Sequence, residues 1–175
     1  LQTDLRYLRN AKELHLYGVS NNLLLAEGFR SKLFYIHRNV NICRLPGNPK
    51  VQAAMSDETH CAILISYSGE TEFIIEVAKV LKKKETPIIA INCIANNRLS
   101  KIADVTLRIS SREMLHTKIG DFATTTSIKY LLDTLYAGIF SFDYQKNLDY
   151  KIQIAKAVDD RHSGYEFIDE DEFPQ

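Results

Sequence analysis

The chain has 175 residues, of which 45% are hydrophobic and 25% are charged, and its 22 basic and 22 acidic side chains give no net charge. This composition is typical of one globular domain and excludes a chain that is disordered over most of its length. Its apolar runs are far shorter than the roughly 18 residues of a membrane span, and no leader pattern opens it, so we expect a cytoplasmic protein.

Periodic apolar patterns predict helices and strands from the start of the chain. Residues 3–11 have the pattern of a helix end, and residues 13–18 alternate as a strand that stops at Gly18. Amphipathic spacing predicts a helix over residues 22–37, and a short strand follows at 40–45.

A nearly continuous apolar run marks the middle of the expected sheet. Before it, Asn48 and Pro49 suit the N-cap and first position of a short helix. Residues 60–66 form the apolar run itself, which is typical of a central parallel strand covered on both faces. A helix is predicted from about 71 to 84, because its last turn carries three lysines that suit the negative end of the helix dipole.

The remaining pattern predicts a strand at 86–93, a short helix near 97–103, a strand at 104–110 and a long helix at 120–140. Five strands separated by helices predict an α/β fold, a three-layer αβα sandwich with a five-stranded parallel sheet. Apolar side chains surround most of the long helix, so we expect a homodimer or homotetramer that uses it. The alternative is that residues 144–158 fold back as a helix and cover these side chains.

The last residues of the chain are acidic. Residues 159–175 hold seven acidic side chains and one basic side chain, Arg161. We expect a flexible, solvated tail that follows one domain at residues 1–158. The rest of the chain is net basic, but it has no dense Lys/Arg stripe with interleaved aromatic residues, so the domain itself is not expected to bind nucleic acid.

The three cysteines, Cys43, Cys61 and Cys93, have no CxxC or CxxH spacing and lie in or at the end of apolar runs. They are expected to be buried thiols rather than metal ligands or disulfide partners. His15 and His60 occupy strand positions and are expected to be structural. We therefore predict no metal site and no cofactor.

The strongest candidate site is the loop Ser66–Thr71, between the central strand and the following helix. Hydroxyl groups at Ser66, Ser68 and Thr71 can donate to phosphate oxygens, and Gly69 allows the backbone to approach an anion closely. The next helix adds free amide groups and the positive end of its dipole. The alternative is that Ser68 or Thr71 only caps this helix. The loop is neither a Walker A nor a GxGxxG sequence.

A second loop, residues 18–22, closes the first strand. Ser20 and Asn22 offer groups that suit sugar hydroxyls, although such residues are also common in turns. Neighbouring parallel strands would bring this loop beside Ser66–Thr71.

A strand ending in Ser-x-Ser-Gly-x-Thr, after an earlier strand ending in Gly-x-Ser-x-Asn, resembles the sugar isomerase (SIS) domain over residues 10 to 142. The resemblance implies a flavodoxin-like fold, phosphosugar binding and self-association through helices. By the same motif, Ser66, Ser68, Gly69 and Thr71 would hold phosphate, and Ser20 and Asn22 would lie by the sugar. Tyr67 replaces a Gln of related synthases and is counted with the sugar-binding residues, as part of the pocket wall.

Within that family, Gly18-Val19 and the segment Leu132–Tyr136 are similar to the sensing domain of RpiR-type transcriptional regulators. These bind DNA through an N-terminal helix-turn-helix domain that is absent here, and since the chain starts at Leu1, we expect a fragment. The alternative function is an aldose–ketose phosphosugar isomerase.

A proton-transfer base would distinguish an isomerase from a sensor. In related synthases a Glu precedes Ile-Gly, whereas this chain has Lys118 before Ile119 and Gly120. A lysine of ordinary pKa, about 10.4, stays protonated and can pair with phosphate. The sensor is therefore the preferred interpretation, with Glu113, His116 and Lys118 as possible pocket residues. For an isomerase, Glu113, His116 or Asp121 would be the candidate base.

Overall fold

The computed structural model describes residues 2–44, 48–93, 96–109, 113–114, 117 and 119–158. Strands and helices alternate along the chain. In order, the elements are α1 Gln2–Asn10, β1 Glu13–Tyr17, α2 Asn21–Phe34, β2 Val40–Ile42, α3 Asn48–Met55, β3 His60–Ile65, α4 Glu72–Lys83, β4 Ile88–Asn92, α5 Arg98–Ile102, β5 Val105–Arg108, α6 Phe122–Ser141 and α7 Tyr144–Val158.

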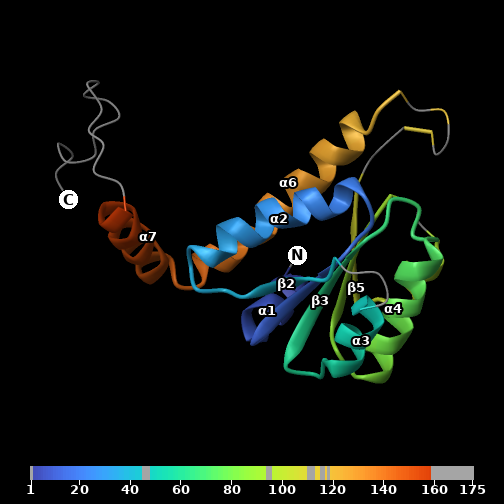
Figure 1. Cartoon of the computed structure of the whole chain (residues 1–175), viewed down its shortest axis with the longest axis horizontal. Coiled ribbons are helices and arrows are strands. Elements are labelled where there is room, and N and C mark those ends of the chain that lie inside the picture. The colour runs from blue at the N-terminus through green and yellow to red at the C-terminus, as the bar shows by residue number, and fades with distance from the viewer. Residues whose placement is uncertain are drawn as a thin grey trace.

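Over the described residues, five parallel strands form one sheet in the order β2-β1-β3-β4-β5 (Figure 1). The registers pair Tyr17 with Leu64 and Ile65 with Ile91. Because every pair is parallel, the carboxyl ends of the strands lie along one edge. The predicted five-stranded, three-layer αβα fold is confirmed, and the loops after β1 and β3 open on the same edge.

Both faces of the sheet are buried, as the continuous apolar strands predicted. One face packs against α1, α2 and α6, through side chains such as Leu8, Phe29 and Leu135. The other packs against α3, α4 and α5, with Ala53, Leu81 and Leu99 among its buried side chains. Figure 1 shows α2 and α6 side by side on one side of the sheet and α3 and α4 on the other. The helices that directly follow β1 and β3, α2 and α4, thus cover opposite faces.

The elements follow the predicted order, and the strands are shorter than predicted. The second strand ends at Ile42 rather than at residue 45. It lies at the edge of the sheet and pairs only with β1, over three residues, so nothing extends its ladder. Helix α3 begins at Asn48 itself, with Pro49 in its first turn.

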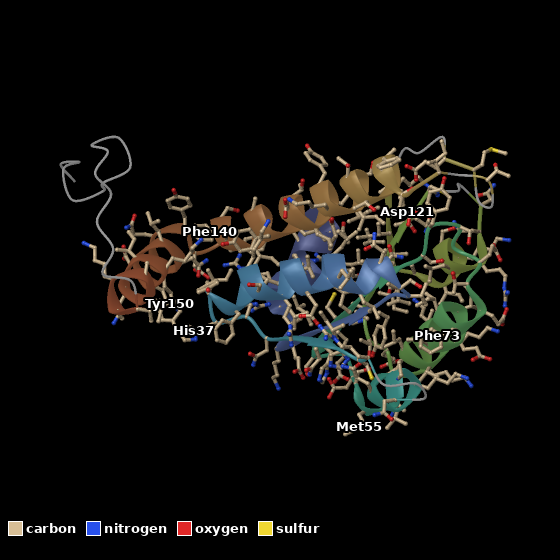
Figure 2. The ribbon with its side chains drawn as sticks, turned by 45° about the horizontal axis from the view of Figure 1, so that its top comes forward. His37, Met55, Phe73, Asp121, Phe140 and Tyr150 are labelled. Carbon is tan, nitrogen blue, oxygen red and sulfur yellow. The ribbon has the colours of Figure 1, made fainter. Side chains whose placement is uncertain are left out.

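Helix α7 continues beyond α6 and leaves the outer side of α6 uncovered (Figure 1). None of its side chains is buried. The ring of Tyr150 contacts that of His37, and the two ring centroids lie 3.7 Å apart (Figure 2). Residues 144–158 are therefore helical, but they do not fold back over α6. Within the described part of the chain, no helix combines the length and the apolar character needed to cross a bilayer.

Candidate phosphate-binding site

The loop after β3 folds back on itself through its own hydroxyl groups. The Oγ of Ser66 lies 2.9 Å from the Oγ1 of Thr71 and accepts a hydrogen bond of 3.2 Å from the amide of Gly69. The Oγ of Ser68 accepts one of 3.2 Å from the amide of Glu70. Ser66 is buried, whereas Ser68 and Thr71 are half-buried. Ser68 and Thr71 are therefore partly accessible to a ligand.

Thr71 is the N-cap residue of α4, yet its side chain makes no capping hydrogen bond. Its hydroxyl contacts Ser66 instead. The first amide groups of a helix have no partner within the helix, and the positive end of the dipole favours an anion. This geometry does not match the interpretation in which Thr71 only caps the helix, and it leaves helix donors available to an anionic group.

Gly69 fits closely against Asn97. The backbone of Gly69 is left-handed, with φ of +70°, and a Cβ there would lie 2.2 Å from Cγ of Asn97. Asn97 is fixed in turn, because its side chain accepts a hydrogen bond from the Ser100 amide (2.8 Å) and donates one to Asn92 (3.0 Å). The loop thus requires glycine and lies against the capping box of α5.

One arginine pairs with the two acidic side chains beside the loop. Arg98 forms a bidentate pair with Glu72, with N···O distances of 2.6 and 3.0 Å, and its backbone amide donates to Glu70 at 2.8 Å. The hydrogen bond from Arg98 lowers the pKa of Glu72, and the same contact raises the pKa of Arg98. Because the guanidinium of Arg98 offsets the charge of Glu72, this carboxylate repels an incoming anion less strongly.

The second predicted loop lies beside the first, because β1 and β3 are neighbours. A Cβ at Gly18 would lie 3.8 Å from Cβ of Ile65. Ser20 is exposed and has a positive φ of 50°, which is uncommon for serine, and its side chain makes no capping hydrogen bond to α2. Asn22 is half-buried in the first turn of α2. The two loops flank the point where the strand order reverses, at which such sheets bind ligands.

Tyr67 joins the loop to the residues before α6. Its hydroxyl donates a hydrogen bond to the backbone carbonyl of Glu113. The carboxylate of Glu113 accepts hydrogen bonds from the amides of Ala123 and Thr124 and from the Thr124 hydroxyl. Glu113 therefore caps the amino end of α6.

The other two predicted pocket residues, His116 and Lys118, lie outside the described residues. Inspection of the sequence did not identify Asn97 and Arg98 as neighbours of the loop. The only sequence signal for them was the capping pattern Asn97-x-x-Ser100, which indicates a helix start but not its position beside Gly69.

Comparison with known proteins identifies the family. The model described as SIS domain matches residues 7–132. An uncharacterized HTH-type transcriptional regulator of Clostridium perfringens is 22% identical over 151 residues, which are 86% of this chain and 54% of that protein. The chain spans about half the length of the curated relatives that it matches.

Solved structures share the fold. The Vibrio vulnificus NanR protein, complexed with ManNAc-6P, has a TM-score of 0.80 and 20% identity, over 90% of this chain and 59% of that one. The sugar isomerase domain of an RpiR transcription factor from Sphaerobacter thermophilus has a TM-score of 0.75 and 13% identity, over 89% and 84%. The neighbours also include a protein inferred to be a 3-hexulose-6-phosphate isomerase.

Proposed function

Because this chain belongs to the SIS domain family, we propose that it binds a sugar phosphate and is the sensing domain of an RpiR-type transcriptional regulator. Residues 1–158 would form this domain, and residues 159–175 an acidic tail. A helix-turn-helix domain elsewhere in the complete protein would bind DNA under the control of the ligand. The proposal is supported by the curated relatives, which are HTH-type regulators, and by NanR, whose structure contains ManNAc-6P.

The observation that carries the proposal is the arrangement of donor groups in the Ser66–Thr71 loop. Ser68 and Thr71 are half-buried, and the side chain of Thr71 leaves the amino end of α4 uncapped. Gly69 holds a left-handed backbone conformation, and its lack of a Cβ lets a ligand approach the loop backbone closely. Hydroxyl groups, amides and a helix dipole are the neutral donors that bind a phosphate without a lysine. The phosphate would bind here, and Ser20, Asn22 and Tyr67 would contact the sugar.

A calorimetric titration tests this proposal. The protein is titrated with ManNAc-6P and with a panel of hexose and pentose phosphates, and each is matched with its unphosphorylated sugar. We expect binding of at least one phosphate ester and none of the matched sugars, because the loop recognises the phosphate. Equal binding of the unphosphorylated sugar would refute a phosphate-directed site.

We further propose that the domain is not an isomerase. Abstraction of a proton from a sugar carbon requires a base within about 3 Å of that carbon. Glu113, one of the predicted candidates, holds its carboxylate against the amides of Ala123 and Thr124. This contact supports a structural role for Glu113. The isomerase remains the second candidate function, because proteins of that class share the fold.

Hydrogen exchange at the sugar distinguishes the two functions. The protein is incubated with sugar phosphates in deuterated water, and NMR follows deuterium at C1 and C2. We expect no protein-dependent exchange. Exchange that disappears in Glu113→Gln or His116→Asn would establish catalysis instead.

We also propose that the domain forms a homodimer or larger assembly through α2 and α6. Large apolar side chains on these helices are exposed: Leu24 (69%), Phe34 (72%), Phe122 (74%) and Tyr130 (70%). Helix α7 continues beyond α6 rather than folding back along it (Figure 1). A group of exposed apolar side chains on one pair of helices supports an interface there.

A further inference from the structure

A second group of polar side chains lies at the other end of the sheet from the Ser66–Thr71 loop. Glu13 and His60 begin β1 and β3 and are paired across the two strands. His15 follows two residues after Glu13 and therefore points to the same face of the sheet. One ligand atom from each of the three residues lies within 4.8 Å of the others. The pairing of β1 with β3 thus creates a Glu-His-His cluster.

The spacing within the cluster is close to that of a metal site. Oε2 of Glu13 lies 3.6 Å from Nε2 of His15 and 3.9 Å from Nε2 of His60. Both distances exceed the usual hydrogen-bond length. Zinc bonds of about 2.0–2.1 Å in a tetrahedral site set the ligand atoms about 3.3 Å apart. Small side-chain rotations would bring these three atoms to that separation around one ion.

Both imidazole rings have a partner at the nitrogen that faces away from the cluster. Nδ1 of His60 lies 2.7 Å from a carboxylate oxygen of Asp57, which also accepts hydrogen bonds from Thr59. Nδ1 of His15 lies 3.4 Å from the hydroxyl of Tyr17. Metal-binding histidines typically have such a partner, which fixes the ring and leaves the other nitrogen for the metal. Here Nε2 of each ring is left for the shared position.

The surroundings of Glu13 fit the same interpretation. The side-chain amide of Asn41 donates a hydrogen bond to Oε1 of Glu13, and the other oxygen, Oε2, faces the imidazoles. A cavity of about 470 Å³ adjoins the cluster and is also lined by Cys43 and Gln52. Oε1 of Gln52 is buried and accepts no hydrogen bond from any described residue. A carboxylate, two imidazoles, a thiol and an unpaired amide oxygen therefore surround one cavity.

We propose that Glu13, His15 and His60 bind one divalent transition-metal ion, with Zn²⁺ as the best fit. Two imidazoles and a carboxylate match the ligands of zinc, whereas calcium and magnesium prefer oxygen alone. The fourth position faces the cavity, where water or the thiolate of Cys43 completes the shell. The ion would link β1 to β3 beneath α3, whose outer end carries the exposed Met55 (Figure 2). This proposal is independent of sugar-phosphate binding.

A cobalt titration tests the site. The full 175-residue chain is stripped of metal with a chelator, titrated with Co²⁺ in the visible range, and then titrated with Zn²⁺ to displace the cobalt. We expect one tetrahedral Co²⁺ per chain. In Glu13→Gln and His60→Gln the affinity should fall by about 100-fold or more, and in Asp57→Ala, which removes an outer partner, by about 10–100-fold.

The matched control is His37→Gln, because His37 is an exposed histidine that contacts Tyr150 rather than the cluster. This variant should bind Co²⁺ like the unmodified chain. Glu13 and His60 are chosen over the buried His15 because they are partly exposed, and circular dichroism verifies that each variant is folded. If His15 and His60 have only a structural role, no tetrahedral cobalt spectrum will appear. That result would overturn the proposal. Binding that survives in both ligand variants but is lost in Cys43→Ser would also overturn it, because the ion would then be bound by thiols.

Discussion

Gly69 and Asn97 face each other across the loop that follows β3, and their fit determines the shape of that loop. In Gly69→Ala, the new Cβ would meet Cγ of Asn97 at 2.2 Å while φ stays at +70°. The left-handed backbone and the overpacking together should lower the free energy of unfolding by about 2–4 kcal/mol. Urea denaturation measures the change.

Gly28→Ala is the matched control for this substitution. Gly28 lies within α2, and a Cβ there would meet no atom within 4 Å. Alanine is the better helix former, so this variant should be stabilised by about 0.4–1 kcal/mol. If both variants change stability equally, the contact with Asn97 does not determine the conformation of the loop.

Ser68 and Thr71 carry the accessible hydroxyl groups of the loop, so their removal should abolish phosphosugar binding. A sugar phosphate at 100 times its dissociation constant adds roughly 2.7 kcal/mol of stability. For a chain of this size this corresponds to an increase in the melting temperature of about 5–11 °C. We expect Ser68→Ala with Thr71→Val to lose this increase in thermal denaturation.

Thr134→Val with Ser141→Ala provides the comparison for that double variant. Thr134 is half-buried and Ser141 is exposed, and within the described part of the chain their hydroxyl groups donate to carbonyls of α6 itself, those of Tyr130 and Gly138. The control should therefore keep the full ligand-induced increase. A full increase in the Ser68 and Thr71 variant would show that the phosphate binds elsewhere.

The sequence revealed the hydroxyl loop because its residues are consecutive. It could not reveal Asn97 against Gly69, because that contact depends on how α5 packs beside α4. The Glu-His-His cluster was missed for a similar reason. Glu13 and His15 are close in sequence, but His60 joins them only through the register of β1 and β3. The alternating Glu-x-His on one strand was the only local signal.

At the scale of helices and strands, the amino end of α6 depends on a side chain from outside the helix. The Glu113 carboxylate accepts hydrogen bonds from the first-turn amides of Ala123 and Thr124. Loss of a capping group costs about 0.5–2 kcal/mol, so Glu113→Ala should lower the free energy of unfolding by that amount. Urea denaturation of Glu113→Ala, with Glu113→Gln as the variant that keeps an acceptor, measures the effect. Unchanged stability in Glu113→Ala would exclude the capping role.

The order of the helices and strands could be predicted because the spacing of apolar residues differs between the two kinds of element. The sequences of β3 and β4 are apolar at nearly every position, and these strands are buried. The sequence of α4 has apolar residues along one face, and this face is buried. The ends of the strands were less predictable, because a strand ends where its pairing with the neighbouring strand ends. The course of α7 could not be predicted, because none of its side chains is buried to direct its packing.

At the scale of the whole molecule, the exposed apolar side chains on α2 and α6 predict self-association. Tyr130 is 70% exposed on α6, so Tyr130→Glu would introduce a charge into the proposed interface. We expect light scattering to give at least twice the chain mass of 20.0 kDa for the unmodified protein and 20.0 kDa for Tyr130→Glu. Met55→Glu changes an equally exposed apolar residue on the opposite face and should leave the mass unchanged. A monomeric unmodified protein would contradict the interface.

Helix α7 has 15 residues and buries none of them, and helices of this length are marginal in water without tertiary contacts. Its amides should therefore exchange with solvent through local unfolding, long before those of α6, whose Leu132 and Leu135 are buried. Mass spectrometry after deuterium labelling would show this difference. Any second copy or neighbouring domain that covers α7 would slow its exchange while the sheet stays unchanged, so α7 can act as a built-in reporter of assembly.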